Sequence, residues 1–227
     1  EKKQDALHRR EGVCRRVKMD IRPLREGAGI PLEVEGLWFH YPNQPYLYRD
    51  LNFHINAKER FLVVGENGVG KSTLLKLMMG IQTPDRGNIR FHPNTDVAYY
   101  AQELEQLDLQ KTVLENVSAQ GCTMKQLRSA LSNFLFYEDD INKKAEVLSP
   151  GEKARIALCR ILLQKANFLI LDEPTNHLDP ETQEVVGKNF RRFEGTIMVV
   201  SHNRRFVEQI GINRVLRLPS GRVEDYH

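Results

Sequence analysis

The chain has 227 residues, of which 41% are hydrophobic and 28% are charged, and its formal net charge is +3. This length suits one globular domain with a full core, and no apolar run approaches the ~20 residues that a membrane-spanning helix needs. Three widely spaced cysteines give no disulfide framework and no metal pattern, and no signal peptide is visible, so we expect a protein of the reducing cytoplasm.

The positive charge is concentrated at the amino end of the chain. Residues 1–28 hold nine Lys/Arg and five Asp/Glu, whereas the remainder holds 24 basic and 25 acidic residues. The first half of this segment has helical composition and ends before Pro23. Clustered basic side chains can contact phosphates, and the simpler alternative is a solvated helix end. Because the first residue is Glu rather than Met, we expect a piece of a longer protein.

Two segments with alternating apolar and polar residues come next, at residues 31–40 and 51–55. Alternation with period two predicts strands that bury one face only, as in an antiparallel sheet. The sequence therefore predicts an antiparallel unit ahead of the glycine-rich segment that follows.

Residues 65–73, Gly-Glu-Asn-Gly-Val-Gly-Lys-Ser-Thr, fit the pattern G-x-x-x-x-G-K-[ST]. A buried-strand run precedes them at 61–64 and good helix formers follow at 74–79. Glycines let successive N–H groups turn inward around phosphate oxygens, and the helix start adds its positive end. Lys71 is placed to reach the β- and γ-phosphates and Ser72 to bind Mg²⁺. The alternative, a glycine-rich turn with a solvated lysine, does not account for the strand and helix flanks. The predicted phosphate-binding residues are Gly65, Glu66, Asn67, Gly68, Val69, Gly70, Lys71, Ser72 and Thr73.

The next part of the chain changes character. A strand-like run at 97–101 ends beside Gln102, which we predict to contact the metal or the attacking water. Residues 103–147 are then dominated by Gln, Glu, Lys and Leu at helical spacing, which predicts a helical subdomain. Its leucines, such as Leu127, Leu131 and Leu135, are interpreted as core positions.

Two further buried-strand runs end in polar residues. Asp172 and Glu173 follow the run 168–171, and open α/β sheets bind ligands at that end of their strands. We predict that Asp172 holds Mg²⁺ and that Glu173 orients or deprotonates the attacking water. A role in capping the turn before Pro174 is compatible with both. His202 follows the run 196–200 and is predicted to sense the γ-phosphate or the water, although a lone His there is more often structural.

Leu148-Ser-Pro-Gly-Glu-Lys-Ala-Arg155 precedes an amphipathic helical run to about Leu163. Ser149, Gly151 and the helix start form a second potential anion site. The segment resembles the signature of ABC ATPases, usually Leu-Ser-Gly-Gly-Gln, and it lies between the phosphate loop and the carboxylates as in that family. Pro150 departs from the usual Gly and removes one N–H donor.

The resemblance covers about residues 32–224 and implies an α/β fold. This fold is an ABC ATPase domain with a P-loop (RecA-like) core, an antiparallel β subdomain and a helical subdomain at about 103–150. It further implies that Ser149 and Gly151 cap the ATP of a partner domain in a head-to-tail pair. Asp179 matches the loop acid that crosses the interface of that pair. Tyr41 matches the aromatic that stacks on adenine, although an aromatic ahead of a strand is usually core. His202 matches the switch histidine.

The wording of the motifs points to one branch of the family. Asp-Glu-Pro-Thr-Asn-His-Leu-Asp at 172–179, Glu-Lys-Ala-Arg at 152–155 and Ser-His-Asn-Arg-Arg-Phe at 201–206 look like ABC-F proteins. That resemblance implies ATP with Mg²⁺, a second ABC domain on the same chain or a homodimer, and action on the ribosome. There, contacts with tRNA or rRNA serve translation regulation or antibiotic resistance. Residues 1–30 would then end a basic interdomain linker, with the ATPase domain at 31–227.

Two other functions stay open. One is the nucleotide-binding subunit of a membrane ABC transporter, which the Asn-His-Leu wording disfavours. The other is a scaffold domain that binds ATP without turnover, which the intact set of Lys71, Asp172, Glu173 and His202 disfavours.

Overall fold

The structure is a computed structural model that describes residues 23, 25–27, 29–101, 107–118 and 121–226. Gln102 and most of the basic amino-terminal segment therefore lie outside the described residues. None of the helices within the described ranges combines the length and apolar character needed to cross a lipid bilayer.

The smaller sheet is antiparallel and has the strand order β2-β1-β4. Its strands are β1 (Leu32–Phe39), β2 (Tyr48–Ile55) and β4 (Arg86–Phe91). Burial alternates along β1 and β2, so the predicted one-sided strands are confirmed. β4 was not predicted, because its residues Arg-Gly-Asn-Ile-Arg-Phe carry few apolar side chains and none of them is buried.

The larger sheet has six strands in the order β5-β6-β7-β3-β8-β9 and is parallel except for its last strand. Its strands are β3 (Arg60–Val64), β5 (Val97–Tyr100), β6 (Phe168–Asp172), β7 (Thr196–Val200), β8 (Arg214–Arg217) and β9 (Arg222–Asp225). Every residue of β6 and β7 is buried, as expected for parallel strands covered on both faces.

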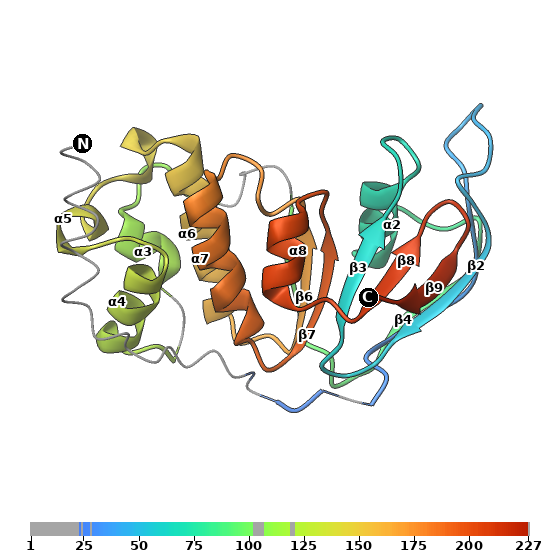
Figure 1. The fold of residues 1–227 in the computed structure, drawn as a ribbon, viewed down its shortest axis with the longest axis horizontal. Coiled ribbons are helices and arrows are strands. Elements are labelled where there is room, and N and C mark those ends of the chain that lie inside the picture. The colour runs from blue at the N-terminus through green and yellow to red at the C-terminus, as the bar shows by residue number, and fades with distance from the viewer. Residues whose placement is uncertain (1–22, 24, 28, 102–106, 119–120, 227) are drawn as a thin grey trace.

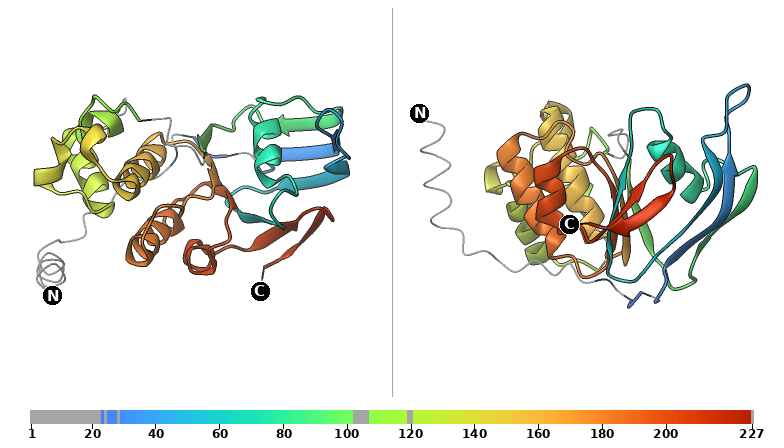
Figure 2. Two further views of the ribbon diagram at one scale, coloured as in Figure 1. Left: turned by 90° about the horizontal axis from the view of Figure 1, so that it is seen from above. Right: turned by 45° about the vertical axis from the view of Figure 1, so that its right-hand side comes forward.

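The parallel sheet separates two hydrophobic cores. Phe168 and Ile170 of β6 point into the core shared with α2 (Lys71–Met78) and the antiparallel sheet, whereas Leu169 and Leu171 point into the core under the other helices. Helices α6 (Pro150–Leu163), α7 (Pro180–Arg191) and α8 (Arg204–Ile210) cover that second face (Figures 1 and 2). The alternation follows from the period of two in a β-strand.

The helical region between β5 and β6 contains α3 (Val113–Val117), α4 (Met124–Asn133), α5 (Glu138–Ile141) and the short 3₁₀ helix η1 (Ala145–Val147). These helices lie beyond α6, on the side away from the antiparallel sheet (Figure 1). Leu127 and Leu131 are buried as predicted. The prediction for Leu135 was wrong, because α4 ends at Asn133 and Leu135 has a left-handed φ of 63° and is only half-buried. Phe134 and Phe136 are buried on either side of it.

Asn167 connects the start of β6 to the turn before β5. Its Nδ2 donates to the Asn94 carbonyl at 2.7 Å, and its Oδ1 accepts from the Asp96 N–H at 2.9 Å. Asn167→Ala removes both bonds at a buried position, so we expect a loss of about 2–3 kcal/mol in the free energy of unfolding. That loss lowers Tm by about 4–10 °C. Asn88→Ala, at an exposed position on β4, is the matched control for thermal melts, and equal melts of the two variants would contradict this role.

Candidate active site

Three loops meet at one edge of the parallel sheet. β7 lies between β6 and β3, so the loops that follow these three strands are neighbours at their carboxyl ends. The phosphate loop follows β3, Asp172 ends β6 with Glu173 directly after it, and His202 comes two residues after β7. Ligands of open α/β sheets bind at this edge.

The phosphate loop ends at Gly70, which is the residue before α2. Gly68 and Gly70 have φ values of 83° and 102°, which favour glycine. The Lys71 side chain folds back across the loop, and its Nζ donates to the carbonyls of Gly65 at 2.8 Å and Glu66 at 2.9 Å. An ammonium group has three N–H donors. With these two bonds made to the described residues, one donor is left for a ligand oxygen.

Asp172 and Ser72 provide the donor set that a Mg²⁺ ion needs. Asp172 is only 3% exposed, and among the described residues its Oδ1 is a buried oxygen without a hydrogen-bond partner. Burial raises the pKa of its carboxyl, while a hydrogen bond from Ser72 and the charges of Lys76 and Lys71 lower it. A buried, unpaired carboxylate oxygen beside a hydroxyl fits a hard cation that takes oxygen ligands and keeps few protein contacts. The residues present therefore fit Mg²⁺.

The raised pKa of Asp172 predicts that this carboxyl lowers the free energy of unfolding of the ligand-free protein, and that the loss grows with pH. A carboxyl whose pKa is raised by folding binds its proton more tightly in the folded state, so its stability contribution falls as the pH rises from about 4 through the raised value. Without Mg²⁺, we expect Asp172→Asn to gain about 2–4 °C in Tm relative to the wild type between pH 4 and pH 7. Thermal melts of both proteins across this range measure the difference, and a constant or shrinking difference would rule the cost out.

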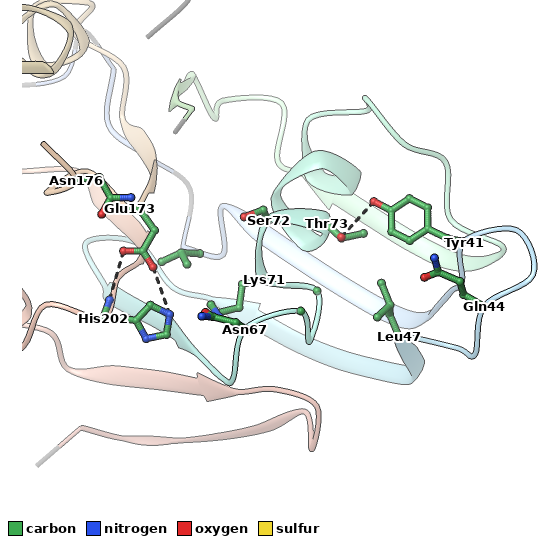
Figure 3. A pocket seen from close by; sticks show the side chains of 13 residues that line it. Tyr41, Gln44, Leu47, Asn67, Lys71, Ser72, Thr73, Glu173, Asn176 and His202 are labelled. Carbon is green, nitrogen blue, oxygen red and sulfur yellow. Dashed lines mark hydrogen bonds and ion pairs between the residues drawn. The ribbon is translucent and has the colours of Figure 1, made fainter. Parts of the chain in front are cut away.

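Glu173 and His202 lie side by side at one end of the cleft (Figure 3). His202 Nε2 lies 3.4 Å from Glu173 Oε1, and the His202 N–H donates to Oε2 at 3.4 Å. The Glu173 side chain is 15% exposed and the His202 ring 55% exposed. Burial raises the pKa of Glu173, the nearby His202 and Lys71 lower it, and Asp172 raises it further. A carboxylate whose pKa is shifted toward neutrality and that is held by a histidine suits a general base.

One cleft of about 470 Å³ is lined by Lys71, Ser72, Glu173 and His202, and it also reaches the antiparallel sheet (Figure 3). The buried Asp172 is not among its lining residues. At that far end, the Tyr41 hydroxyl lies 3.2 Å from Thr73 Oγ1. Sequence reasoning missed Gln44, Leu47, Asn176 and Val200, because loop residues and a strand end carry no chemical signal in one sequence. The lining residues are Tyr41, Gln44, Leu47, Asn67, Gly68, Gly70, Lys71, Ser72, Thr73, Glu173, Asn176, Val200 and His202.

The signature residues and Asp179 are not among the residues that line this cleft. Ser149 forms a capping box with Glu152 at the start of α6, where its Oγ lies 2.8 Å from Glu152 Oε2. Gly151 packs against the next loop, since a Cβ there would lie 2.7 Å from the His177 carbonyl oxygen. Asp179 caps α7 by accepting from the Thr182 N–H at 3.0 Å. Together they occupy a surface distinct from the cleft, around the starts of α6 and α7.

Comparison with known proteins shows what the chain is similar to. The sequence profile of the ABC transporter family matches residues 48–176. The chain is 45% identical over 204 residues to the ATP-binding protein YdiF of Bacillus subtilis, covering 89% of this chain and 32% of that protein. It is 36% identical over 235 residues to ABC transporter F family member 5 of Arabidopsis thaliana, covering 100% of this chain and 34% of that protein. The chain thus spans about a third of the length of these relatives.

The fold also matches a solved structure. The dimeric post-hydrolysis state of the ATP-binding cassette MJ0796 with ADP and Pi superposes with a TM-score of 0.72 at 20% identity, covering 86% of this chain and 99% of that one. At this identity the match shows the fold. The predicted fold class, an α/β P-loop domain with an antiparallel and a helical part, is confirmed.

Proposed function

This chain belongs to the ABC transporter family as an ABC-F-like ATPase domain, and from that premise we propose that the cleft hydrolyses ATP to drive action on the ribosome. The observation that carries the catalytic part is the meeting of the phosphate loop, Glu173 and His202 at one sheet edge. The ATPase fold needs such a constellation because phosphoryl transfer depends mainly on positioning and charge neutralisation.

The tasks are divided among the residues of the proposed site. The glycine-rich loop and Lys71 hold the phosphates, and Tyr41 stacks on the adenine. Glu173 accepts the proton of the attacking water, and His202 holds the Glu173 carboxylate and contacts the γ-phosphate. Ser72 and Asp172 would hold Mg²⁺, which would neutralise phosphate charge during transfer. Because Gln102 lies outside the described residues, its proposed contact with the metal or water rests on sequence alone.

We further propose that a second ABC domain closes head to tail over this one. Ser149, Gly151 and Asp179 do not line this domain's own cleft, which supports a role toward the nucleotide of a partner. The start of α6 presents backbone N–H groups and the positive end of a helix of 14 residues, which suit a phosphate. Pro150 takes the first helical position, where its missing N–H removes one donor from that surface.

The ribosomal part of the proposal rests on the ABC-F-like motifs and relatives. We propose that residues 1–30 end a basic linker, that 31–227 form the ATPase domain and that about 103–150 form its helical subdomain. The linker's Lys and Arg would contact rRNA or tRNA phosphates, in translation regulation or in ribosome protection against an antibiotic. The alternative is the nucleotide-binding subunit of a membrane transporter.

A trapped, ATP-bound form tests the proposal. The test uses a two-domain protein that carries Glu173→Gln in this domain and the equivalent substitution in the second ABC domain. Ribosome co-sedimentation is then measured with and without ATP. Retention of the variant on ribosomes only with ATP supports a translation factor whose two ABC domains are held closed. No retention, with ATP binding demonstrated on the same sample, would overturn the ribosomal role, and copurification with a membrane permease would favour the transporter subunit.

A further inference from the structure

Tyr48 is a buried tyrosine that touches the phosphate loop from the opposite sheet. It is the first residue of β2, is 3% exposed, and its hydroxyl donates to the Gly70 carbonyl. Burial raises the pKa of Tyr48 above its ordinary value, so the phenol stays protonated and remains a donor. No task in the proposed mechanism uses this hydroxyl.

The Gly70 carbonyl connects the phosphate loop to the first turn of α2. Gly70 precedes α2, and its oxygen accepts the Leu74 N–H at 2.8 Å, which is the first bond of that helix. Gly70 has no side-chain cap. The Tyr48 hydroxyl therefore supplies a second bond to this oxygen and fixes the direction of the first helical turn. That turn carries Lys71, Ser72 and Thr73, whose N–H groups have no partner within the helix and could therefore bind a phosphate.

The packing around Gly70 leaves no space for a side chain at this position. A Cβ on Gly70 would lie 2.6 Å from the Tyr48 oxygen and 3.1 Å from its Cζ, so the glycine backbone rests directly on the phenol. A second contact holds the first turn of α2, since the Tyr41 hydroxyl lies 3.2 Å from Thr73 Oγ1. Tyr41 and Tyr48 flank residues 42–47, which include Gln44 and Leu47 of the cleft wall. The residues at both ends of this segment therefore contact the start of α2.

We propose that Tyr48 is a positioning residue for phosphate binding, whose hydroxyl holds Gly70 and so aims the first turn of α2 into the cleft before a nucleotide arrives. This inference rests on the proposed function and deepens it. Preorganised donors bind their ligand more tightly because less ordering remains to be done on binding. Loss of the bond should therefore weaken phosphate binding whatever base is attached, and should leave the chemical step nearly unchanged.

The test compares Tyr48→Phe with two other variants of the full chain. Tyr100→Phe deletes the hydroxyl of another buried tyrosine, on β5, and is the matched control. Tyr41→Ala removes the proposed base-stacking ring. For each protein, dissociation constants are measured by displacement of a fluorescent ATP analogue with the magnesium complexes of ATP, GTP and inorganic tripolyphosphate. Turnover at saturating ATP is measured in parallel.

We expect Tyr48→Phe to weaken all three ligands by the same factor, about three- to tenfold, with kcat within about twofold of the wild type. Tyr100→Phe should bind all three normally. Tyr41→Ala removes both the proposed base-stacking ring and the hydroxyl beside Thr73, so it should lose more affinity for the two nucleotides than for tripolyphosphate. Amide hydrogen exchange in Tyr48→Phe should rise within residues 71–75 and stay normal in β6 and β7, which marks a local effect rather than general loosening.

Several results would overturn the role of Tyr48. These are an unchanged affinity, an equal loss in Tyr100→Phe, a loss confined to the nucleotides, or unfolding of Tyr48→Phe at the assay temperature. Failure of the folded wild type to bind magnesium–ATP would instead overturn the proposed function itself.

Discussion

ATP turnover is expected to fall about 100- to 1,000-fold in Glu173→Gln, with nucleotide affinity nearly unchanged. The amide keeps the shape of the side chain and still faces His202, so the cleft retains its form. It cannot accept a proton from water, however, and general base catalysis contributes about 10²–10⁴ in rate. Initial rates of phosphate release and equilibrium ATP binding, measured on the same preparation with a competent partner domain, separate the two effects.

The control for this prediction is Glu194→Gln, the same chemical change at an exposed position in the turn between α7 and β7. It should leave both turnover and affinity unchanged. Full turnover in Glu173→Gln, with the partner's own site also disabled, would remove Glu173 from the catalytic role. A parallel loss of ATP binding would make it a binding residue instead.

Lys71→Met is expected to weaken ATP binding about 10- to 100-fold. Lys71 is 8% exposed and is the first residue of α2, from which its ammonium reaches back to bond two carbonyls of the phosphate loop. Its loss removes a charge-assisted hydrogen bond to phosphate, typically about 1.5–3 kcal/mol. It also removes a donor from both carbonyls, although the Glu66 carbonyl still accepts from the Val69 N–H at 3.4 Å. Titration of a fluorescent ATP analogue measures the affinity, and turnover should fall with it.

Lys125→Met, on the exposed side of α4, is the matched lysine control and should bind ATP like the wild type. Lys71→Arg helps to identify the cause. A larger, forked head group cannot occupy the loop as the ammonium does, so this variant should also bind poorly although its charge is preserved. Normal binding in Lys71→Arg would mean that charge alone matters at this position.

Much of the fold follows from local sequence pattern. The buried runs 61–64, 168–171 and 196–200 are confirmed as strands of the parallel sheet, and the Pro-Ser-Gly turn at 219–221 joins β8 to β9. Strand order does not follow from such patterns, because it depends on pairing between residues far apart in the chain. The placement of β7 between β6 and β3 is what brings His202 beside Glu173, and no local signal encodes it.

The site was predictable where a residue's role depends on its immediate neighbours. The glycines of the phosphate loop and the two carboxylates after β6 belong to short segments with a fixed chemistry. The sequence assigned no role to Tyr48 and did not predict the packing of Gly151, because these depend on contacts with Gly70 and with the His177 carbonyl. In the sequence Tyr48 has no visible role, and the contact of Gly151 with the neighbouring loop cannot be seen. Leu135 continues the helical spacing of Leu127 and Leu131 in the sequence, but α4 already ends at Asn133.

The walls of the cleft come from two sheets that share no strand pairing among the described residues. Tyr41 and Leu47 belong to the β1–β2 connection, and Lys71 and Glu173 to the parallel sheet and its loops. Side-chain packing in a shared core joins the two sheets. We therefore expect the antiparallel sheet to open as a smaller unit at lower free energy than the whole domain. A nucleotide that contacts both walls raises the free energy of this partial opening. While it is bound, the substrate would thus connect the two sheets, and they would unfold together as one unit.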